Sequence, residues 1–247
     1  MVSLKLDTYL ESIETDLNQQ ASSPLLNRIL EKNDTNNYKI IKEEFKSFLF
    51  NNPNYFQIRI INSSNGNEMI RVERQKKQIC ISPIYKLQNK SNRDYFQEIL
   101  KLPRGSTFFS KIDLNKENGK ISSPITPTLR IAKTLNINGE NSFIIILNVN
   151  LSDLFDELKT LLPLSYHLRI LNQDGHYFIH PNTEKEFTFE FNKPSYFQKE
   201  FNFNDEGLNI NNQILKTDST LNIIKKLNYE RPFYSVYAIV SANNNVI

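Results

Sequence analysis

Apolar residues recur at helical spacing over the first part of the chain. Leu4, Leu6, Leu10, Ile13 and Leu17 are separated by acidic and amide side chains, which predicts an amphipathic helix within residues 3–34. The Ser-Ser-Pro triplet at 22–24 interrupts this pattern, because Ser23 can cap a helix that restarts with proline at its first position. A second helix is predicted at 42–50, before the turn at 51–53.

The spacing of apolar residues then changes from helical to alternating. Two runs rich in β-branched residues flank the sequence Ser-Ser-Asn-Gly at 63–66, which is typical of a β-hairpin. The nearly continuous apolar run at 143–150 favours a central strand that is covered on both faces. We predict strands at Tyr55–Asn62, 68–74, 106–112, 129–136 and 143–150, and helices at 92–101 and 151–162.

The order of elements begins again after Pro163. We predict a strand at 166–171, an Asx-Gly turn at 172–175, a second strand at 176–180 and a helix at 194–200. Three further strands are predicted at Gln213–Lys216, 221–227 and 233–240. The two copies repeat an architecture and not a sequence. This pattern predicts an α+β protein with a helical stalk at 1–37 and two lobes at 38–163 and 164–247, each an antiparallel sheet with flanking helices.

Composition excludes several classes of protein. The formal net charge of +3 arises from evenly spread charges, so no nucleic-acid-binding surface is indicated. The single cysteine, Cys80, excludes an internal disulfide and a thiolate metal cluster, and its apolar neighbours suggest an inert core position. No apolar run approaches the roughly 18 residues of a membrane-spanning helix.

Motifs for catalysis are hard to find in the sequence. It has no nucleophile elbow, phosphate-binding loop, dinucleotide-binding glycine motif or HExxH, and we expect no cofactor. His167, His176 and His180 are close in the sequence, and the last two could share a strand face and hold a metal. The simpler interpretation is that His180 ends a strand with a hydrogen bond.

The predicted helix at 92–101 suggests a binding site. Its apolar side carries Tyr95 and Phe96, and Arg93 lies at the edge of that side. An arginine there needs either an anionic ligand or an internal partner such as Glu68 or Asp113, because an unpaired buried guanidinium is costly. Arg59 and Arg71 on the predicted hairpin could lie on solvated faces, whereas Asn148 is a polar side chain within the most apolar strand.

The order of three segments resembles the double Cache family of tandem PAS-like sensor domains. These segments are YFQIRIIN with SSNGNEMIRVER, LQNKSNRDYFQEILKLPRGSTFFSKIDLN, and PTLRIAKTLNINGENSFIIILNVNL. The stretch LNQDGHYFIHPN resembles the membrane-proximal module of that family, and the likeness covers about residues 4 to 243. It implies a periplasmic, ligand-sensing part of a bacterial inner-membrane receptor, placed between two membrane segments and followed by a histidine kinase, diguanylate cyclase or chemoreceptor output.

The resemblance also implies a ligand site in the membrane-distal lobe. Members that bind amino acids use an Arg-x-Trp-Tyr run for the ligand carboxylate and a strand aspartate for the amine; here the corresponding positions are Arg93, Tyr95, Phe96 and Asn148. Because a neutral amide cannot neutralise an ammonium group, we expect plain carboxylates to bind better than α-amino acids. The expected ligand-binding residues are Arg93, Tyr95, Phe96, Ser110, Asp113, Asn148 and Arg71, and no residue is expected to be catalytic.

Three functions therefore stay open at this point. The first is a receptor sensor domain that binds a small organic ligand, forms a homodimer through its long helix, and transmits the signal through a proximal lobe that does not itself bind. The second is a metal-dependent hydrolase that uses the histidine cluster. The third is a ligand-free dimerisation spacer.

Overall fold

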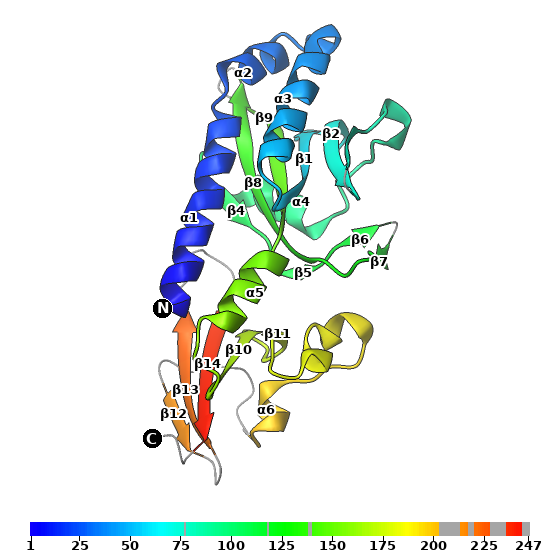
Figure 1. The fold of residues 1–247 in the computed structure, drawn as a ribbon. Helices are drawn as coiled ribbons and strands as arrows, with labels where there is room; N and C mark the ends of the chain where they lie inside the picture. The colour runs from blue at the N-terminus through cyan, green and yellow to red at the C-terminus, as the bar shows by residue number, and fades with distance from the viewer. Residues whose placement is uncertain are drawn as a thin grey trace. The chain divides into compact units, whose positions relative to one another are not determined.

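A computed structural model describes residues 1–76, 78–117, 119–137, 140–202, 213–216, 220–227 and 236–243. The chain divides into two compact units. The N-terminal unit comprises residues 8–112 and 126–151, and the C-terminal unit comprises residues 1–7, 113–125 and 152–247. Each unit is built on its own antiparallel sheet (Figure 1).

Four α-helices contribute to the N-terminal unit. They are α1 (Val2–Ala21), whose first turns belong to the other unit, α2 (Pro24–Glu31), α3 (Tyr38–Asn51) and α4 (Asp94–Lys101), with short 3-10 helices at Thr35–Asn37 and Ile84–Lys86. The break between α1 and α2 falls where the sequence predicts it. The Ser23 hydroxyl accepts a hydrogen bond from the amide of Leu26, and Pro24 occupies the first helical position.

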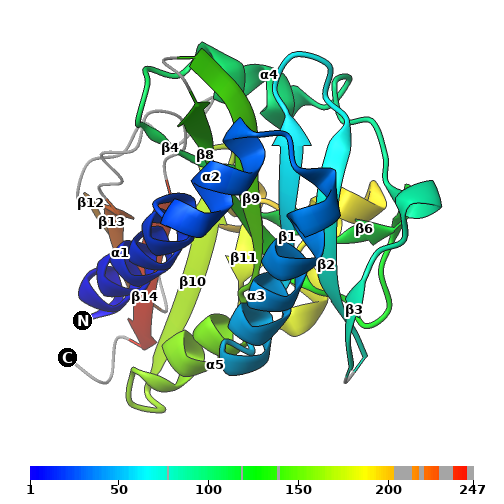
Figure 2. The ribbon, with the colours of Figure 1, turned by 90° about the horizontal axis from the view of Figure 1, so that it is seen from above.

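The sheet of the N-terminal unit has the strand order β3-β2-β1-β9-β8-β4. These strands are β1 (Tyr55–Asn62), β2 (Glu68–Gln75), β3 (Gln78–Ile81), β4 (Thr107–Phe109), β8 (Pro127–Ile137) and β9 (Glu140–Asn150). Helix α3 packs on β1, β2 and β3 and α2 packs on β8, while α4 lies on the opposite face (Figure 2). Phe96 and Ile99 of α4 pack there against Ile61, Ile144 and Ile146. The central strand β9 is therefore covered on both faces, as its apolar run predicts.

The C-terminal unit repeats this order of elements. Its sheet runs β11-β10-β14-β13-β12, formed by β10 (Tyr166–Asn172), β11 (Tyr177–Ile179), β12 (Gln213–Lys216), β13 (Thr220–Leu227) and β14 (Val236–Asn243). Its other elements are α5 (Ser152–Thr160), α6 (Phe197–Glu200), 3-10 helices at Thr183–Lys185 and Thr188–Phe191, and the short strands β5 (Asp113–Leu114), β6 (Lys116–Glu117) and β7 (Lys120–Ile121). Phe197 of α6 is fully buried against Leu171, Tyr177 and Ile239.

The predicted α+β architecture with two sheets is confirmed, and the differences are local. Helix α3 begins at Tyr38 rather than at residue 42, and β4 is shorter than the predicted strand at 106–112. Strand β3 was not predicted, and Cys80 within it is partly exposed rather than buried in the core. Residues 233–235 of the last predicted strand lie outside the described residues. Within the described part of the chain, no helix is long and apolar enough to cross a membrane.

Candidate functional site

A band of polar side chains crosses the sheet of the N-terminal unit on the face that α4 covers. Gln57 of β1 lies opposite Asn148 of β9 on one side and opposite Glu73 of β2 on the other. Two residues further along β1, Arg59 lies opposite Arg71. Directly opposed residues in an antiparallel pair project from the same face, so this band places two arginines, a carboxylate and two amides side by side.

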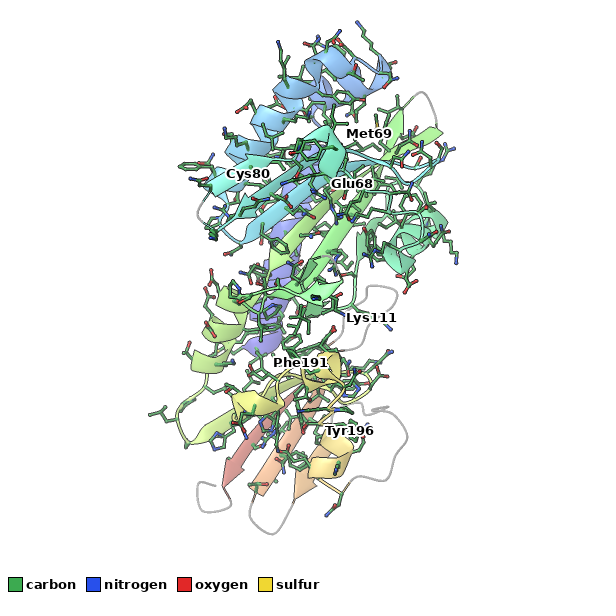
Figure 3. The ribbon with its side chains drawn as sticks, turned by 90° about the vertical axis from the view of Figure 1, so that its right-hand side faces the viewer. Glu68, Met69, Cys80, Lys111, Phe191 and Tyr196 are labelled. Carbon is green, nitrogen blue, oxygen red and sulfur yellow. The ribbon has the colours of Figure 1, made fainter. Side chains whose placement is uncertain are left out.

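A β-bulge adds Glu68 to the band. Ile60 pairs with Ile70, but the next residue, Ile61, pairs with Glu68, so Met69 is the extra residue of β2. The bulge brings Glu68 to the same face as Arg71 although three positions separate them. Both Glu68 and Met69 are labelled on β2 in Figure 3.

Arg59 is the centre of this arrangement and is only 4% exposed. Its Nη1 lies 3.3 Å from Glu68 Oε1 and 3.5 Å from the Tyr95 hydroxyl, and its Nη2 donates to Asn148 Oδ1 at 3.1 Å. The guanidinium carbon lies 5.9 Å from the centre of the Tyr95 ring. Burial acts to lower the pKa of Arg59, but Tyr95 and Glu68 outweigh it and the pKa is raised. Arg59 therefore stays protonated inside the unit.

Arg71 extends the network towards the edge strand. Its Nη1 lies 3.1 Å from Glu68 Oε2, and its Nε donates to the Ser82 hydroxyl at 2.9 Å. The Ser82 hydroxyl donates to Glu73 at 3.1 Å, and Gln57 donates to the same carboxylate at 2.8 Å. Although burial opposes ionisation, Arg71 and these hydrogen bonds lower the pKa of Glu73.

Lys90 brings a third cation to Glu68. Its Nζ lies 3.7 Å from Glu68 Oε1 and donates to Gln88 Oε1 at 2.6 Å. The Lys90 amide donates to the carbonyl of Gly66 at 2.7 Å, which ties this loop to the tip of the β1–β2 hairpin. Burial lowers the pKa of Lys90 to about 8, and the charge of Arg59 acts in the same direction.

The charges of this cluster do not cancel. Arg59, Arg71 and Lys90 contribute three positive charges, while Glu68 and Glu73 contribute two negative ones. Among the described residues, none accepts a hydrogen bond from the buried Nε of Arg59. Excess buried positive charge and a free guanidinium donor are features that a ligand carboxylate would satisfy.

The structure brings three of the predicted site residues together. Tyr95, Asn148 and Arg71 all belong to the cluster around Arg59. The prediction that Asn148 is a buried, hydrogen-bonded amide is confirmed, since it is 4% exposed and also donates to Gln57 at 3.2 Å.

Arg93 does not lie where its spacing predicts. It is the N-cap of α4, with extended backbone angles (φ −93°, ψ 133°), because the helix begins at Asp94 rather than at residue 92. Its side chain is exposed, although its charge is near enough to lower the pKa of Lys90. Phe96 is 2% exposed and packs in the core beneath α4 with Ile61 and Ile146.

The structure places Ser110 at the end of a strand and Asp113 in the other unit. The Ser110 hydroxyl donates to the carbonyl of Lys111 and accepts from the amide of Arg130, so it ends strand β4. Asp113 begins the short strand β5, in the C-terminal unit.

The main residues that sequence reasoning missed are Arg59, Glu68 and Lys90. Arg59 was expected on a solvated face, but α4 covers that face and Arg59 is buried. Its position between Ile58 and Ile60 gave one signal, because a charge inside such an apolar strand often has a buried partner. Lys90 lies in a loop where periodicity gives no information.

The histidines do not form a metal site. His167 is exposed, and the ring of His176 stacks on that of Phe189 with 5.1 Å between the ring centres. His180 ends its strand with a hydrogen bond to Asn182, as predicted. No group of three or more potential metal ligands occurs within the described ranges. The hydrolase alternative therefore has no support.

Comparisons with solved structures find the same fold in bacterial sensor domains. The domain of a sensory box/GGDEF family protein from Vibrio parahaemolyticus has a TM-score of 0.75 at 19% identity, over 99% of this chain and 92% of that one. The ligand-binding domain of the Pseudomonas aeruginosa PAO1 amino acid chemoreceptor PctC, in complex with GABA, has a TM-score of 0.68 at 11% identity, over 97% and 94% of the two chains. The sensory domain of the Campylobacter jejuni chemoreceptor Tlp3, with isoleucine bound, has a TM-score of 0.65 at 14% identity, over 99% and 89%.

Sequence comparison gives the family directly. A comparison with curated proteins finds no significant match. The family described as "Bacterial histidine kinase, sensor domain" matches residues 5–219, which is most of the chain. Together with the fold, this match confirms the resemblance to tandem PAS-like sensor domains, so the chain is a sensor domain and not a catalytic domain. The chain belongs to the bacterial histidine kinase sensor-domain family.

Proposed function

We propose that the N-terminal unit is the ligand-binding lobe of an extracytoplasmic receptor domain and that it binds a small organic carboxylate on the face covered by α4. The observation that carries the proposal is the buried Arg59, whose Nε has no acceptor among the described residues and whose cluster has an excess positive charge. The planar donors of a guanidinium group match the two oxygens of a carboxylate. The solved relatives in complex with GABA and isoleucine support small organic ligands as the class.

The proposal assigns separate roles to the residues of the site. Arg59 is the anchor for the carboxylate, Tyr95 and Asn148 orient it, and Arg71 and Lys90 add positive charge. Arg93 is at the exposed rim, where it attracts the anion. Because position 148 carries an amide, the ammonium group of an α-amino acid has no carboxylate to pair with there.

The remaining parts of the chain have a role in signalling. We infer that the stalk (1–37) and the two lobes (38–163 and 164–247) form the periplasmic part of an inner-membrane receptor, and that α1 mediates parallel dimerisation in the intact protein. Leu4 on α1 is 70% exposed, which fits a helix face that a second copy covers. A ligand that prefers one geometry of the lobe shifts the population of signalling states without any chemical step.

A thermal-shift screen of small carboxylates and amino acids tests the proposed site. A ligand at 100 times its dissociation constant should stabilise the protein by about 2.7 kcal/mol. We expect Arg59→Gln to abolish this stabilisation, Arg93→Ala to weaken it, and Arg104→Ala, an exposed arginine of the same unit, to leave it unchanged. Asn148→Asp should favour zwitterionic amino acids over plain carboxylates. A carboxylate shift that persists in Arg59→Gln would show that the anchor is elsewhere.

A further inference from the structure

The carboxylate of Glu200 in the C-terminal unit is surrounded by hydrogen-bond donors. Arg169 donates to Oε1 through Nε at 3.2 Å and through Nη2 at 3.0 Å. Oε2 lies 3.1 Å from His180 Nε2, 2.7 Å from Lys185 Nζ and 3.1 Å from the Tyr177 hydroxyl. A guanidinium fork, an ammonium, an imidazole and a phenol thus converge on a single carboxylate.

These donors are fixed by further contacts on the sheet. Arg169 Nη1 donates to the Ser241 hydroxyl at 2.9 Å, and that hydroxyl donates to the fully buried Asn222 at 2.6 Å. His180 Nδ1 accepts from the amide of Asn182 at 2.9 Å, and its Nε2 lies within 3.2 Å of both Glu200 oxygens and of Arg169 Nε. Arg169 and His180 are therefore held in place by groups other than Glu200.

The central arginine occupies the same place in both units. Residues 58–62 read IRIIN and residues 168–172 read LRILN, so Arg59 and Arg169 hold the same position in the first strand of each sheet. Asn148 lies opposite the residue two positions before Arg59, and Ser241 lies opposite the residue two positions before Arg169. Each arginine donates to that polar residue of the neighbouring strand.

The covering segments also correspond. The Arg59 guanidinium lies 5.9 Å from the centre of the Tyr95 ring, on α4, and the Arg169 guanidinium lies 5.2 Å from the centre of the Phe201 ring, directly after α6. The two units differ in the source of the carboxylate, because Glu68 belongs to the sheet whereas Glu200 belongs to the covering helix. A side chain from the covering helix reaches the arginine from the side on which we place the ligand in the N-terminal unit.

We propose that the C-terminal unit contains a second carboxylate-binding site, formed by Arg169, Tyr177, His180 and Lys185, and that Glu200 is its built-in occupant. The site goes beyond the proposed function, which concerns the N-terminal unit alone. The matching ligand class is a monocarboxylate as small as acetate, which corresponds to the part of Glu200 beyond its Cβ. While Glu200 occupies the site, an external carboxylate does not enter it.

Chemical rescue tests this second site. Glu200→Ala should lower the melting temperature and increase amide hydrogen exchange in β10 and in residues 177–202. Sodium acetate should reverse both effects saturably, whereas sodium chloride at equal ionic strength should not. Glu184→Ala, which removes an exposed glutamate of the same unit, should show neither the loss nor the recovery. The exchange measurement separates this effect from carboxylate binding in the N-terminal unit.

Two double variants assign the rescue to one unit. Rescue should survive in Glu200→Ala combined with Arg59→Gln and should disappear in Glu200→Ala combined with Arg169→Met. If Glu200→Ala does not fold in chloride, recovery of folded protein in acetate supports the site, and Glu200→Ser provides a second variant for the same titration. The absence of a saturable acetate effect in both variants would overturn the proposal, whatever the outcome for the N-terminal unit.

Discussion

Arg59 and Arg71 lie directly opposite each other in the β1–β2 ladder, and both pair with Glu68. Like charges that face each other across a strand pair repel, so the pairing of these two strands depends on the carboxylate between them. Glu68 is 5% exposed and also lies near Lys90. This one carboxylate therefore links strand pairing to the charge of the proposed ligand site.

Glu68→Gln should destabilise the N-terminal unit strongly. Removal of one partner from a buried ion pair typically costs about 3–5 kcal/mol, because the remaining charge is left uncompensated. Glu43→Gln on α3 is the matched control, since the Glu43 side chain is 64% exposed and should contribute at most about 1 kcal/mol. Denaturant unfolding of both variants measures the difference, and equal effects would contradict a buried, essential carboxylate.

Carboxylate binding should weaken as the pH rises through about 8. Burial, with the charge of Arg59, lowers the pKa of Lys90 to about 8, so the ammonium that attracts an anion is lost above that pH. In the absence of ligand, the stability of the folded protein changes with pH in the opposite direction to the binding affinity. Between about pH 8 and 10.5 the unfolded chain still binds this proton and the folded chain does not, so the free energy of unfolding gains a contribution as pH rises.

Lys90→Met provides the comparison for both effects. We expect the variant to bind carboxylate more weakly at pH 7 and with less change between pH 7 and 9 than the wild type. Titrations followed by thermal shift at several pH values measure this. An identical pH dependence in the two proteins would remove Lys90 from the site.

Gly66→Ala should disturb both stability and binding. Gly66 has φ +73°, and an added Cβ would lie 2.5 Å from the backbone nitrogen of Ser91, next to Lys90. Gly105→Ala is a matched control, because Gly105 has φ +80° but no atom within 4 Å of its added Cβ. The control should lose about 1–2 kcal/mol from its left-handed backbone alone, and Gly66→Ala should lose more and bind carboxylate less tightly. Equal losses with unchanged binding would mean that the hairpin tip does not position Lys90.

Acid should destabilise the C-terminal unit through Glu200. Burial acts to raise the pKa of this carboxyl, but hydrogen bonds from His180 and Lys185 and the charge of Arg169 hold it well below its usual range. The stabilisation is present above the unfolded pKa of about 4.5 and is lost as the pH falls further. The difference in unfolding free energy between the wild type and Glu200→Gln should therefore shrink from pH 7 to pH 3, and a constant difference would contradict the prediction.

The fold could be predicted from the sequence wherever a local rule acts alone. Ser23 and Pro24 start α2 because a hydroxyl cap and a fixed φ act within one turn, and Gly66 permits the hairpin because it adopts a positive φ. The alternation of β1 is enough to put Arg59 on one face with Gln57. It could not show that α4 covers this face, because coverage depends on residues more than 30 positions away.

The site was harder to predict than the fold because it depends on contacts between residues that are far apart in the sequence. Asn148 was identified because an amide within an apolar strand is conspicuous in the sequence itself. Arg93 was misplaced because a shift of two residues in the start of α4 moves it from the helix face to the N-cap. Glu68 meets Arg59 only through the bulge at Met69, and a bulge changes the pairing without a clear signature in the amino-acid pattern.

That bulge has a consequence for how the hairpin tolerates changes in length. In a regular strand, loss of one residue turns every side chain beyond it to the other face. Here, deletion of Met69 would leave Ile70 opposite Ile60 and Glu68 opposite Ile61, which are the pairs that already exist. The strand can therefore become one residue shorter with both arginines and their carboxylate still on the same side. A variant that lacks Met69 should therefore keep the charge network of the hairpin.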